Sequence, residues 1–415
     1  SEGARGDQCE ACGSSLDPTE LIEPRNAQDG SPLELRETTH WFLPLRDWQD
    51  RLTALIDEHP EWKENVRNYC RGWFKDGLDD RAVTRDLGWG VPVPLPDHDG
   101  KVFYVWFEAP IGYVSSTREW AAAQGDPEAW RTWWLDPQTR LVHFIGKDNV
   151  FVHAVMCPAM LMAHSEDYVL PDNVPANEFL NLEGQKLSTS RGFAVWLPEY
   201  LEKFAADPLR YTLARNLPET RDMNFTWEGF LARNNNELGN NFGNLINRVF
   251  TFIHKYFEGK VPEWSEAAMT DLDRAALAEV EGELENWANH LERFEVKAAL
   301  EAAFRAGQAG NRYFDESAPF KSRKTDLERC AQCLGVIVQI LRMLAVMLAP
   351  VTPFAVEKLW SWLGMEGDLW RAGWKEAKRP VPAGRPLGKP EILFPRLEEE
   401  QIAAEVARLN ELLED

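Results

Sequence analysis

The chain has 415 residues, of which 44% are apolar and 27% charged, and its formal net charge is −22. This globular composition has enough length for two or three domains. The acidic balance argues against indiscriminate nucleic-acid binding, which depends on basic surface, but it allows a partner held by a local basic strip. The six cysteines show no dense disulfide spacing, which favours a reducing, cytoplasmic setting.

No segment is predicted to enter a membrane, and no signal-peptide pattern is found. The longest apolar run, residues 334–349, is interrupted by Gln339 and Arg342 and is too short to span a bilayer. We expect it to form a buried helix.

Residues 1–40 are predicted to be irregular and contain Cys9 and Cys12 in a Cys-x-x-Cys-Gly pattern. This is half of a zinc knuckle, because structural zinc takes four ligands. Either the other half lies upstream or the two thiols are free. Cys330 and Cys333 share the spacing, but they stand in an apolar helix and are predicted to be core thiols.

From about residue 101 to 182 the pattern becomes α/β. KVFYVWF (101–107) and LVHFI (141–145) have the composition of buried strands, and a helical stretch lies between them. Strands separated by a helix predict a parallel sheet, where ligands bind at the carboxyl ends of strands. Asp148 and His153 would lie at such an end. Asp148 could hold a ribose diol or cap a helix, and His153 could equally be a core residue.

The segment EGQKLSTSRG (183–192) crowds a lysine, three hydroxyl residues and an arginine behind a glycine. Such a composition is typical of a surface turn. It also suits an anion clamp, because Lys186, Arg191, hydroxyls and backbone N–H groups bind phosphate oxygens.

From about residue 198 onward strand signals fade and helical spacing dominates. The stretches 227–257, 277–307 and 326–350 are predicted helices, and Pro350 and Pro353 end the last of them. We predict an all-α bundle over residues 198–395, followed by an acidic helix or linker at 396–415.

The order of these motifs resembles that of the methionyl-tRNA synthetase family. The resemblance runs over nearly the whole chain and rests on FYVWFEAPIGY, HFIGKDNVFVHAVMCPAML, EGQKLSTSRG, NNNELGNNFGNLINR, NRYFDESAP and MLAPVTPFAVEKLW. It implies a remnant of the zinc-knuckle connective insertion (1–40), the second half of a class I Rossmann-type catalytic domain (41–197), and a stem-contact region with an α-helical anticodon-binding bundle (198–395). The implied activity is ATP-dependent activation of methionine and its transfer to tRNA(Met).

The resemblance also implies roles for individual residues. The KMSKS-like loop at 186–190, with the adjacent Arg191, would hold and activate ATP through Lys186, Ser188, Thr189, Ser190 and Arg191. Gly146 and Asp148 would hold the ATP ribose. Thr189 stands where the family most often has a second lysine. The methionine site would comprise Arg85, Trp106, Ala109, Pro110, Tyr113, Asn149, His153 and Cys157, of which Asn149 and Cys157 depart from the usual Ile and Trp.

In the bundle, the resemblance implies that Asn244 and Arg248 read the CAU anticodon and that an anticodon base stacks on Pro319 and Phe320. Mg²⁺ would accompany ATP, and Zn²⁺ would be bound in the complete protein with Cys9 and Cys12 among its ligands. The HIGH-motif half of the family is not found in the sequence, so we expect a truncated chain or one half of a split enzyme, inactive alone. The alternative from a different class is a non-catalytic tRNA-binding module.

Overall fold

The computed structural model describes residues 21–26, 29–34, 36–96, 100–188 and 192–414. The chain divides into two compact units, Ser1–Asn177 and Glu178–Asp415. This division comes earlier in the chain than the predicted boundary between residues 197 and 198, so the loop at 186–190 belongs to the second unit. Cys9 and Cys12 lie outside the described residues.

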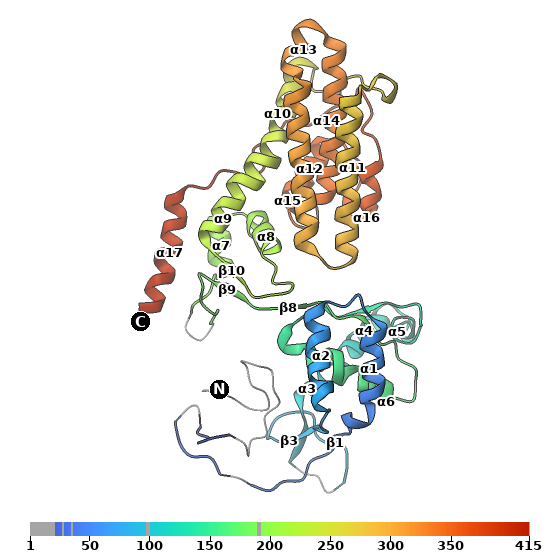
Figure 1. Cartoon of the computed structure of the whole chain (residues 1–415), viewed down its shortest axis with the longest axis vertical. Helices are drawn as coiled ribbons and strands as arrows, with labels where there is room; N and C mark the ends of the chain where they lie inside the picture. Colours follow the sequence, from blue (N-terminus) through green and yellow to red (C-terminus); the bar gives the residue numbers. More distant parts are fainter. Residues whose placement is uncertain (1–20, 27–28, 35, 97–99, 189–191, 415) are drawn as a thin grey trace. The chain divides into compact units, whose positions relative to one another are not determined.

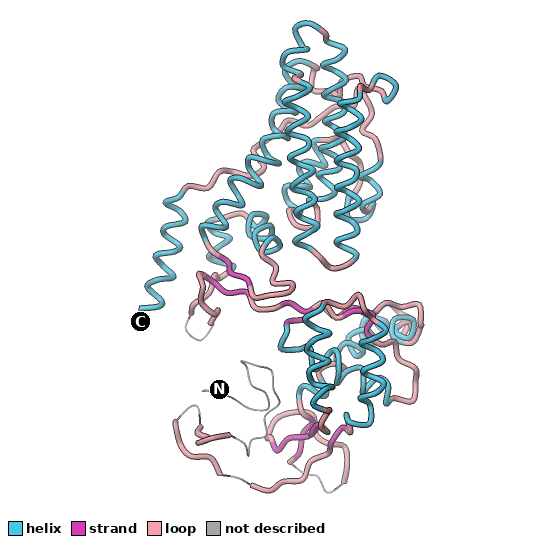
Figure 2. Tube along the Cα trace, in the orientation of Figure 1, coloured by secondary structure: helices cyan, strands magenta, loops and turns pink. Residues whose placement is uncertain are grey.

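The first unit is a mixed α/β structure with short strands (Figure 2). Its helices are α1 (Gln49–Glu58), α2 (Glu64–Asp76), α3 (Val105–Glu108), α4 (Ile111–Ala123), α5 (Trp130–Trp134) and α6 (Cys157–Ala163), with 3₁₀ turns at Leu45–Trp48 and Lys147–Asn149 and a π-helical turn at Val152–Met156. Its strands are β1 (Phe42–Leu43), β2 (Arg81–Ala82), β3 (Thr84–Asp86), β4 (Lys101–Phe103), β5 (Leu141–Val142), β6 (Ile145–Gly146), β7 (Pro171–Asn173) and β8 (Ala176–Asn177).

The predicted parallel pairing is found at LVHFI, which forms two short strands: β5 pairs with β7, and β6 pairs with β8. Their partners lie in residues 171–177 and not in KVFYVWF. The prediction for KVFYVWF was wrong beyond Phe103. Only Lys101–Phe103 is a strand, it pairs antiparallel with β3, and Val105 already begins a helix. A short apolar and aromatic run cannot be assigned to strand or helix by periodicity alone, because a buried strand and a short helical segment give the same pattern.

The core of the first unit lies between α1, α2 and the helical segment that follows β6. Leu52 and Ile56 on α1 and Val66 on α2 are buried against Val150 and Val155. Because each helix places its apolar residues on one face, this packing fixes the segment that carries His153.

The second unit joins a small α/β part to a helical bundle (Figure 1). Its elements are β9 (Leu180–Leu182), β10 (Met223–Phe225), α7 (Leu197–Lys203), α8 (Ala206–Arg215), α9 (Trp227–Ala232), the π-helix η5 (Arg233–Gly243), α10 (Asn244–Tyr256), the 3₁₀ turn η6 (Glu266–Ala268), α11 (Asp271–Glu292), α12 (Val296–Ser317), α13 (Pro319–Thr325), α14 (Leu327–Leu348), α15 (Pro353–Trp362), α16 (Leu369–Ala372), the 3₁₀ turn η7 (Trp374–Lys378) and α17 (Glu399–Glu414). The parallel pairing of β9 with β10 shows that strands do not end at residue 198.

Helix α14 is the central helix of the bundle. It is apolar enough to cross a membrane by length and composition, but 94% of its most apolar window is buried inside the protein. It is therefore the core helix that the sequence predicts, and it packs against α11, α12 and α13.

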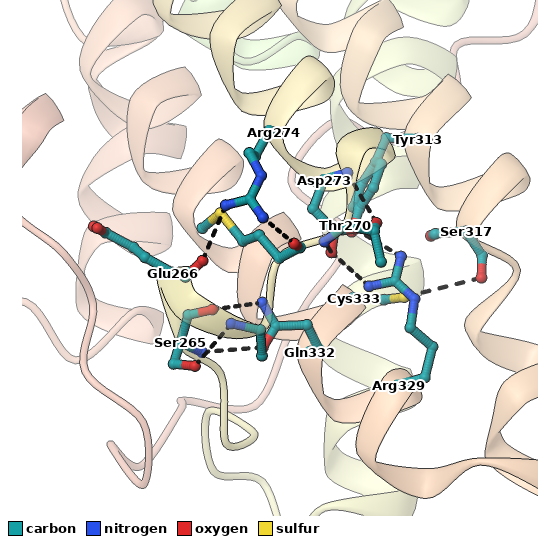
Figure 3. Close-up of polar contacts among 12 residues, drawn as sticks. Ser265, Glu266, Thr270, Asp273, Arg274, Tyr313, Ser317, Arg329, Gln332 and Cys333 are labelled. Carbon is teal, nitrogen blue, oxygen red and sulfur yellow. Dashed lines mark hydrogen bonds and ion pairs between the residues drawn. The ribbon is translucent and has the colours of Figure 1, made fainter.

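A buried ionic network ties three bundle helices together (Figure 3). Thr270 and Asp273 form a capping box at the start of α11. The Asp273 carboxylate accepts hydrogen bonds from the Tyr313 hydroxyl on α12 (2.5 Å) and from both terminal nitrogens of Arg329 on α14 (2.5 and 2.6 Å). Since Asp273 is fully buried, these partners are what allow its charge there.

The segment predicted as an acidic helix or linker is helix α17. It packs its buried Ile402 and Leu409 on a cluster that includes Phe230 of α9 and Tyr200 of α7. Its acidic residues therefore belong to an amphipathic helix of the second unit.

Candidate functional site

The first group of predicted site residues meets at the segment that follows β6. Pro158 has no N–H to donate to residue 154, and its ring crowds that carbonyl, which accounts for the wide π-helical turn at Val152–Met156. This turn directs His153 toward α4. There Nε2 of His153 lies 2.8 Å from the Tyr113 hydroxyl, while Nδ1 lies 3.0 Å from the carbonyl oxygen of Asn149.

This geometry decides the tautomer of His153. The Asn149 carbonyl can only accept, so Nδ1 carries the proton and donates it. Burial lowers the pKa of His153, so the ring is neutral at pH 7 and Nε2 accepts the hydrogen bond from Tyr113. The structure thus joins Tyr113, Asn149 and His153 in one chain of hydrogen bonds, which the sequence did not predict.

His143 is a member of this group that the sequence-based list of site residues missed. Its ring centroid lies 5.1 Å from that of His153 and 5.5 Å from that of Tyr113, and its side chain is only 6% exposed. Burial, with His153 beside it, lowers the pKa of His143 to about 4. Its Nε2 is buried without a hydrogen-bond partner among the described residues. A single histidine in an apolar run such as LVHFI gives no sequence signal beyond its presence.

The apolar candidates lie around the same helices. Trp106 on α3 and Tyr113 on α4 are 42% and 44% exposed, whereas Pro110 between them is buried. Ala109 is exposed next to Pro110. Cys157 is buried, and burial raises the pKa of its thiol to about 12, so it is an apolar wall rather than a nucleophile.

Gly146 and Asp148 lie where predicted, at and just after the carboxyl end of β6, and both are exposed. No side-chain capping bond is formed at the turn Lys147–Asn149. Arg85 donates to the carbonyl oxygens of Ala82 and Thr84 (3.0 and 2.8 Å) and stacks on the Tyr104 ring at 3.8 Å.

The KMSKS-like loop starts directly after β9 from a constrained turn. Glu183 and Gly184 both have positive φ (47° and 78°), and Leu182 and Gln185 exchange two backbone hydrogen bonds of 2.9 Å. The Glu183 carboxylate accepts from the backbone N–H of Trp227 (2.7 Å). Because both ends of the turn are fixed to β10 and α9, the following residues project from a rigid base.

Lys186 and Ser188 occupy the described part of this loop. Lys186 is exposed, with Nζ 5.6 Å from the Phe179 ring centroid, and Ser188 N–H donates to the Phe193 carbonyl at 3.0 Å. Thr189, Ser190 and Arg191 lie outside the described residues.

The third group of predicted site residues lies on α10 and around the turn between α12 and α13. Asn244 is exposed at the start of α10, and Arg248 one turn later pairs with Asp315 at 2.6 Å and stacks on Phe314 at 4.2 Å. Asp315 lies near the end of α12, just before the turn to Pro319. Phe320 follows it on α13 and is 45% exposed.

The turn between α12 and α13, which precedes Phe320, is fixed by a contact with the bundle core. Ala318 adopts a left-handed conformation (φ 45°, ψ 56°) between α12 and α13. The buried Cys330 thiol donates to the Pro319 carbonyl at 3.3 Å, and burial raises the pKa of this thiol to about 11. Cys330 and Cys333 are thus core thiols, as predicted.

The described residues contain no group of three or more His, Cys, Asp or Glu side chains placed to hold a metal ion. Only Cys9 and Cys12 were predicted as zinc ligands, and they lie outside this part of the chain. Structural zinc requires four ligands, so two more would have to join Cys9 and Cys12.

Comparisons with known proteins now place this arrangement in a class. A family model described as class I tRNA synthetases (M) matches residues 1–250, and one described as the anticodon-binding domain of methionyl tRNA ligase matches residues 261–411. The chain belongs to the class I tRNA synthetases of the methionyl type.

Individual relatives agree with this assignment. The chain is 48% identical over 417 residues to a methionine–tRNA ligase of Bacteroides fragilis and 47% identical over 438 residues to one of Salinibacter ruber. Both alignments cover 99% of this chain. They cover 59% of the Bacteroides fragilis protein and 61% of the Salinibacter ruber protein. The chain therefore spans about 59% of the length of the curated relatives it matches. Because each relative aligns as one continuous chain, these matches give no support to a separately encoded partner half.

Solved structures show the same fold. The Mycobacterium tuberculosis methionyl-tRNA synthetase bound by methionyl-adenylate matches with a TM-score of 0.79 and 28% identity, over 92% of this chain and 74% of that one. The apo form of the same enzyme matches with a TM-score of 0.77 and 29% identity, over 90% and 72% of the two chains.

Proposed function

We propose that this chain takes part in methionine–tRNA ligation, in which ATP activates methionine to methionyl-adenylate and the methionyl group passes to tRNA(Met). The observation that carries the proposal is the hydrogen-bonded group of Tyr113, His153 and Asn149 beside the exposed Trp106. The relatives named as methionine–tRNA ligases and the neighbour bound to methionyl-adenylate support it.

The methionine side chain is unbranched and polarisable, and aromatic rings suit its sulfur. In this proposal Trp106, Ala109, Pro110, Tyr113, Asn149, His153 and Cys157 form its pocket. The neutral His153 fixes the Tyr113 ring, so that the oxygen of this tyrosine faces the pocket as a hydrogen-bond acceptor. Arg85 would act indirectly, by orienting a group near the substrate amino nitrogen.

ATP would bind with its ribose on Gly146 and Asp148 and its phosphates at the loop containing Lys186, Ser188, Thr189, Ser190 and Arg191. The methionine carboxylate attacks the α-phosphate, and pyrophosphate leaves with the electron pair of the broken P–O bond. Cations and hydroxyls placed before the reaction stabilise the charge that develops on the leaving group. Mg²⁺ would accompany the ATP.

The bundle would select the tRNA. Asn244 and Arg248 share one face of α10 because they are four residues apart, and they would read the CAU anticodon. Phe320 offers an exposed π face, which is all that base stacking requires, next to Pro319. A terminal ribose hydroxyl of the tRNA then attacks the methionyl carbonyl, and AMP leaves. A cytoplasmic location and Zn²⁺ bound by Cys9, Cys12 and further ligands belong to the same proposal, but no step depends on the metal.

The proposal is tested by pyrophosphate exchange with the protein at its full natural length. We expect Lys186→Ala to lower the methionine-dependent exchange rate by about 10²-fold or more, as for the loss of a preorganised donor. The KM for methionine should change little, because Lys186 acts on the departing pyrophosphate.

Two controls accompany this measurement. Lys186→Arg keeps the charge and should retain more activity than Lys186→Ala. Lys260→Ala removes an exposed lysine paired with Glu258 in the bundle and should leave the exchange rate unchanged. An unaltered rate with a raised methionine KM in Lys186→Ala would contradict the role assigned to this loop.

A further inference from the structure

Helix α13 is strongly basic although the chain as a whole is acidic. Its seven residues, PFKSRKT, contain Lys321, Arg323 and Lys324 and no carboxylate. The helix stands at the end of the bundle beside the C-terminal end of α10 (Figure 1). There Lys255 adds a fourth cation. These four residues are called the basic end.

Aromatic rings order the basic end. The Phe252 and Tyr256 rings, one turn apart on α10, have centroids 4.7 Å apart. Arg323 of α13 lies over the Tyr256 ring at 4.2 Å, and Lys255 lies 5.3 Å from the same ring. Stacking holds the Arg323 guanidinium in place, so this side chain loses little freedom when it binds an anion.

The basic end continues the predicted anticodon face. Asn244, Arg248, Phe252 and Tyr256 follow one another at intervals of four residues, so each is the surface neighbour of the next on α10, and the row winds about 120° around the helix from its first member to its last. On α13, Lys321 lies 6.0 Å from the ring of Phe320, the predicted stacking residue. The two surfaces are therefore adjacent on both helices.

The cations of the basic end are available to a ligand. Among the residues that the structure describes, no carboxylate forms an ion pair with Lys255, Lys321, Arg323 or Lys324. Three carboxylates of the neighbouring elements have other partners: Asp315 pairs with Arg248, Glu258 with Lys260, and Asp326 caps α14 by accepting from the Arg329 N–H.

We propose that the basic end binds the sugar–phosphate backbone of the RNA stem-loop that carries the anticodon, with Arg323 as its central contact. This inference rests on the proposed function and adds to it a contact that is independent of base sequence. Lysine and arginine side chains donate hydrogen bonds but accept none, which suits phosphate oxygens. A ligand that places its bases on Asn244, Arg248 and Phe320 must carry its backbone across the neighbouring surface.

The test uses the chain of residues 1–415 and two labelled RNA stem-loops. One has a CAU anticodon, and the other differs only in the three anticodon bases. Dissociation constants are measured by fluorescence anisotropy between about 50 and about 200 mM salt, because phosphate contacts weaken with salt in proportion to their number. Circular dichroism checks that each variant is folded.

Arg323→Ala should weaken binding of both stem-loops by the same factor, about fivefold at the lowest salt, and reduce the slope of log affinity against log salt by about one unit. Arg323→Lys should retain most of the affinity. The matched control is Lys358→Ala, which removes a lysine of α15 that is paired with Glu391. It should change neither the affinity nor the salt slope.

Unchanged affinities and salt slope in Arg323→Ala would overturn this inference, as would a loss confined to the CAU stem-loop. Failure of the proposed function gives a different result. In that case the wild-type chain does not prefer the CAU stem-loop, while the comparison of Arg323→Ala with wild type still decides whether the basic end contacts the backbone. If the wild-type chain binds neither stem-loop, both proposals are wrong.

Discussion

Tyr113 and His153 show how single atoms set the chemistry of a pocket. The Asn149 carbonyl fixes the proton on Nδ1 of His153, and this leaves Nε2 as an acceptor for the Tyr113 hydroxyl. The tyrosine oxygen then keeps only acceptor capacity toward the pocket. A buried histidine with a lowered pKa thus acts here as a fixed orienting group rather than as a proton carrier.

We expect Tyr113→Phe to raise the KM for methionine by about three- to tenfold in pyrophosphate exchange, because the buried Nε2 of His153 loses its donor. The value of kcat should fall less. Tyr168→Phe in the same unit, whose ring contacts neither His143 nor His153, is the matched control. Equal effects of the two substitutions would show that the hydrogen bond to His153 has no role in binding.

At the scale of elements, Asp273 joins the start of α11 to α12 and α14. Burial alone would raise the pKa of this carboxyl, but hydrogen bonds from Arg329 and Tyr313 hold it below its ordinary value. A carboxylate with a lowered pKa in the folded state stabilises the protein above its unfolded pKa of about 3.9. This stability is lost as the pH falls through the folded-state pKa.

Asp273→Asn should lower the free energy of unfolding at pH 7 by about 3 kcal/mol, because it leaves Arg329 without its counter-charge in a half-buried position. Urea unfolding at several pH values measures this. The difference between wild type and variant should begin to shrink below about pH 4, where the carboxyl of the unfolded chain is protonated, and should vanish as the pH falls through the lower folded-state pKa of Asp273. A difference independent of pH down to the acid transition would argue against the ionic origin.

The anticodon surface gives a second prediction about elements. Arg248→Ala and Phe320→Ala should each weaken charging of tRNA with a CAU anticodon and spare methionine-dependent pyrophosphate exchange. Loss of base stacking alone is worth about 1–3 kcal/mol. Phe354→Ala, which removes another exposed aromatic ring, serves as the control. If exchange and charging fall together, the anticodon assignment is wrong or the bundle has unfolded.

The elements also show why sequence patterns predict some structure and not the rest. The apolar stretch that becomes α14 is long, so its helical state and burial followed directly. LVHFI and KVFYVWF have similar compositions, yet only the first gives parallel strands, whereas the second pairs antiparallel with β3 and turns into helix α3 at Val105. The site residues came from resemblance to a family, whereas the bond between Tyr113 and His153 and the place of His143 depend on the turn before Pro158.

At the scale of the whole molecule, each unit has its own core. Leu52, Ile56 and Val66 belong to a cluster of the first unit, and α14 is the centre of a separate cluster in the second. We therefore expect two calorimetric unfolding transitions. Leu52→Ala should lower the midpoint of one, at a cost of about 2–5 kcal/mol, and Asp273→Asn should lower the other. Both substitutions shifting one common transition would show that the units unfold together.

Helices α9, η5 and α10 form an uninterrupted rod from Trp227 to Tyr256 within the second unit. Its first residue is bonded to Glu183 at the base of the Lys186 loop, and its last belongs to the aromatic group beside α13. At about 1.5 Å per residue the rod is on the order of 40 Å long. Moving as one body, the rod would shift Trp227 by about 3 to 4 Å when it tilts by about 5° about Tyr256. This displacement is comparable to a hydrogen-bond length.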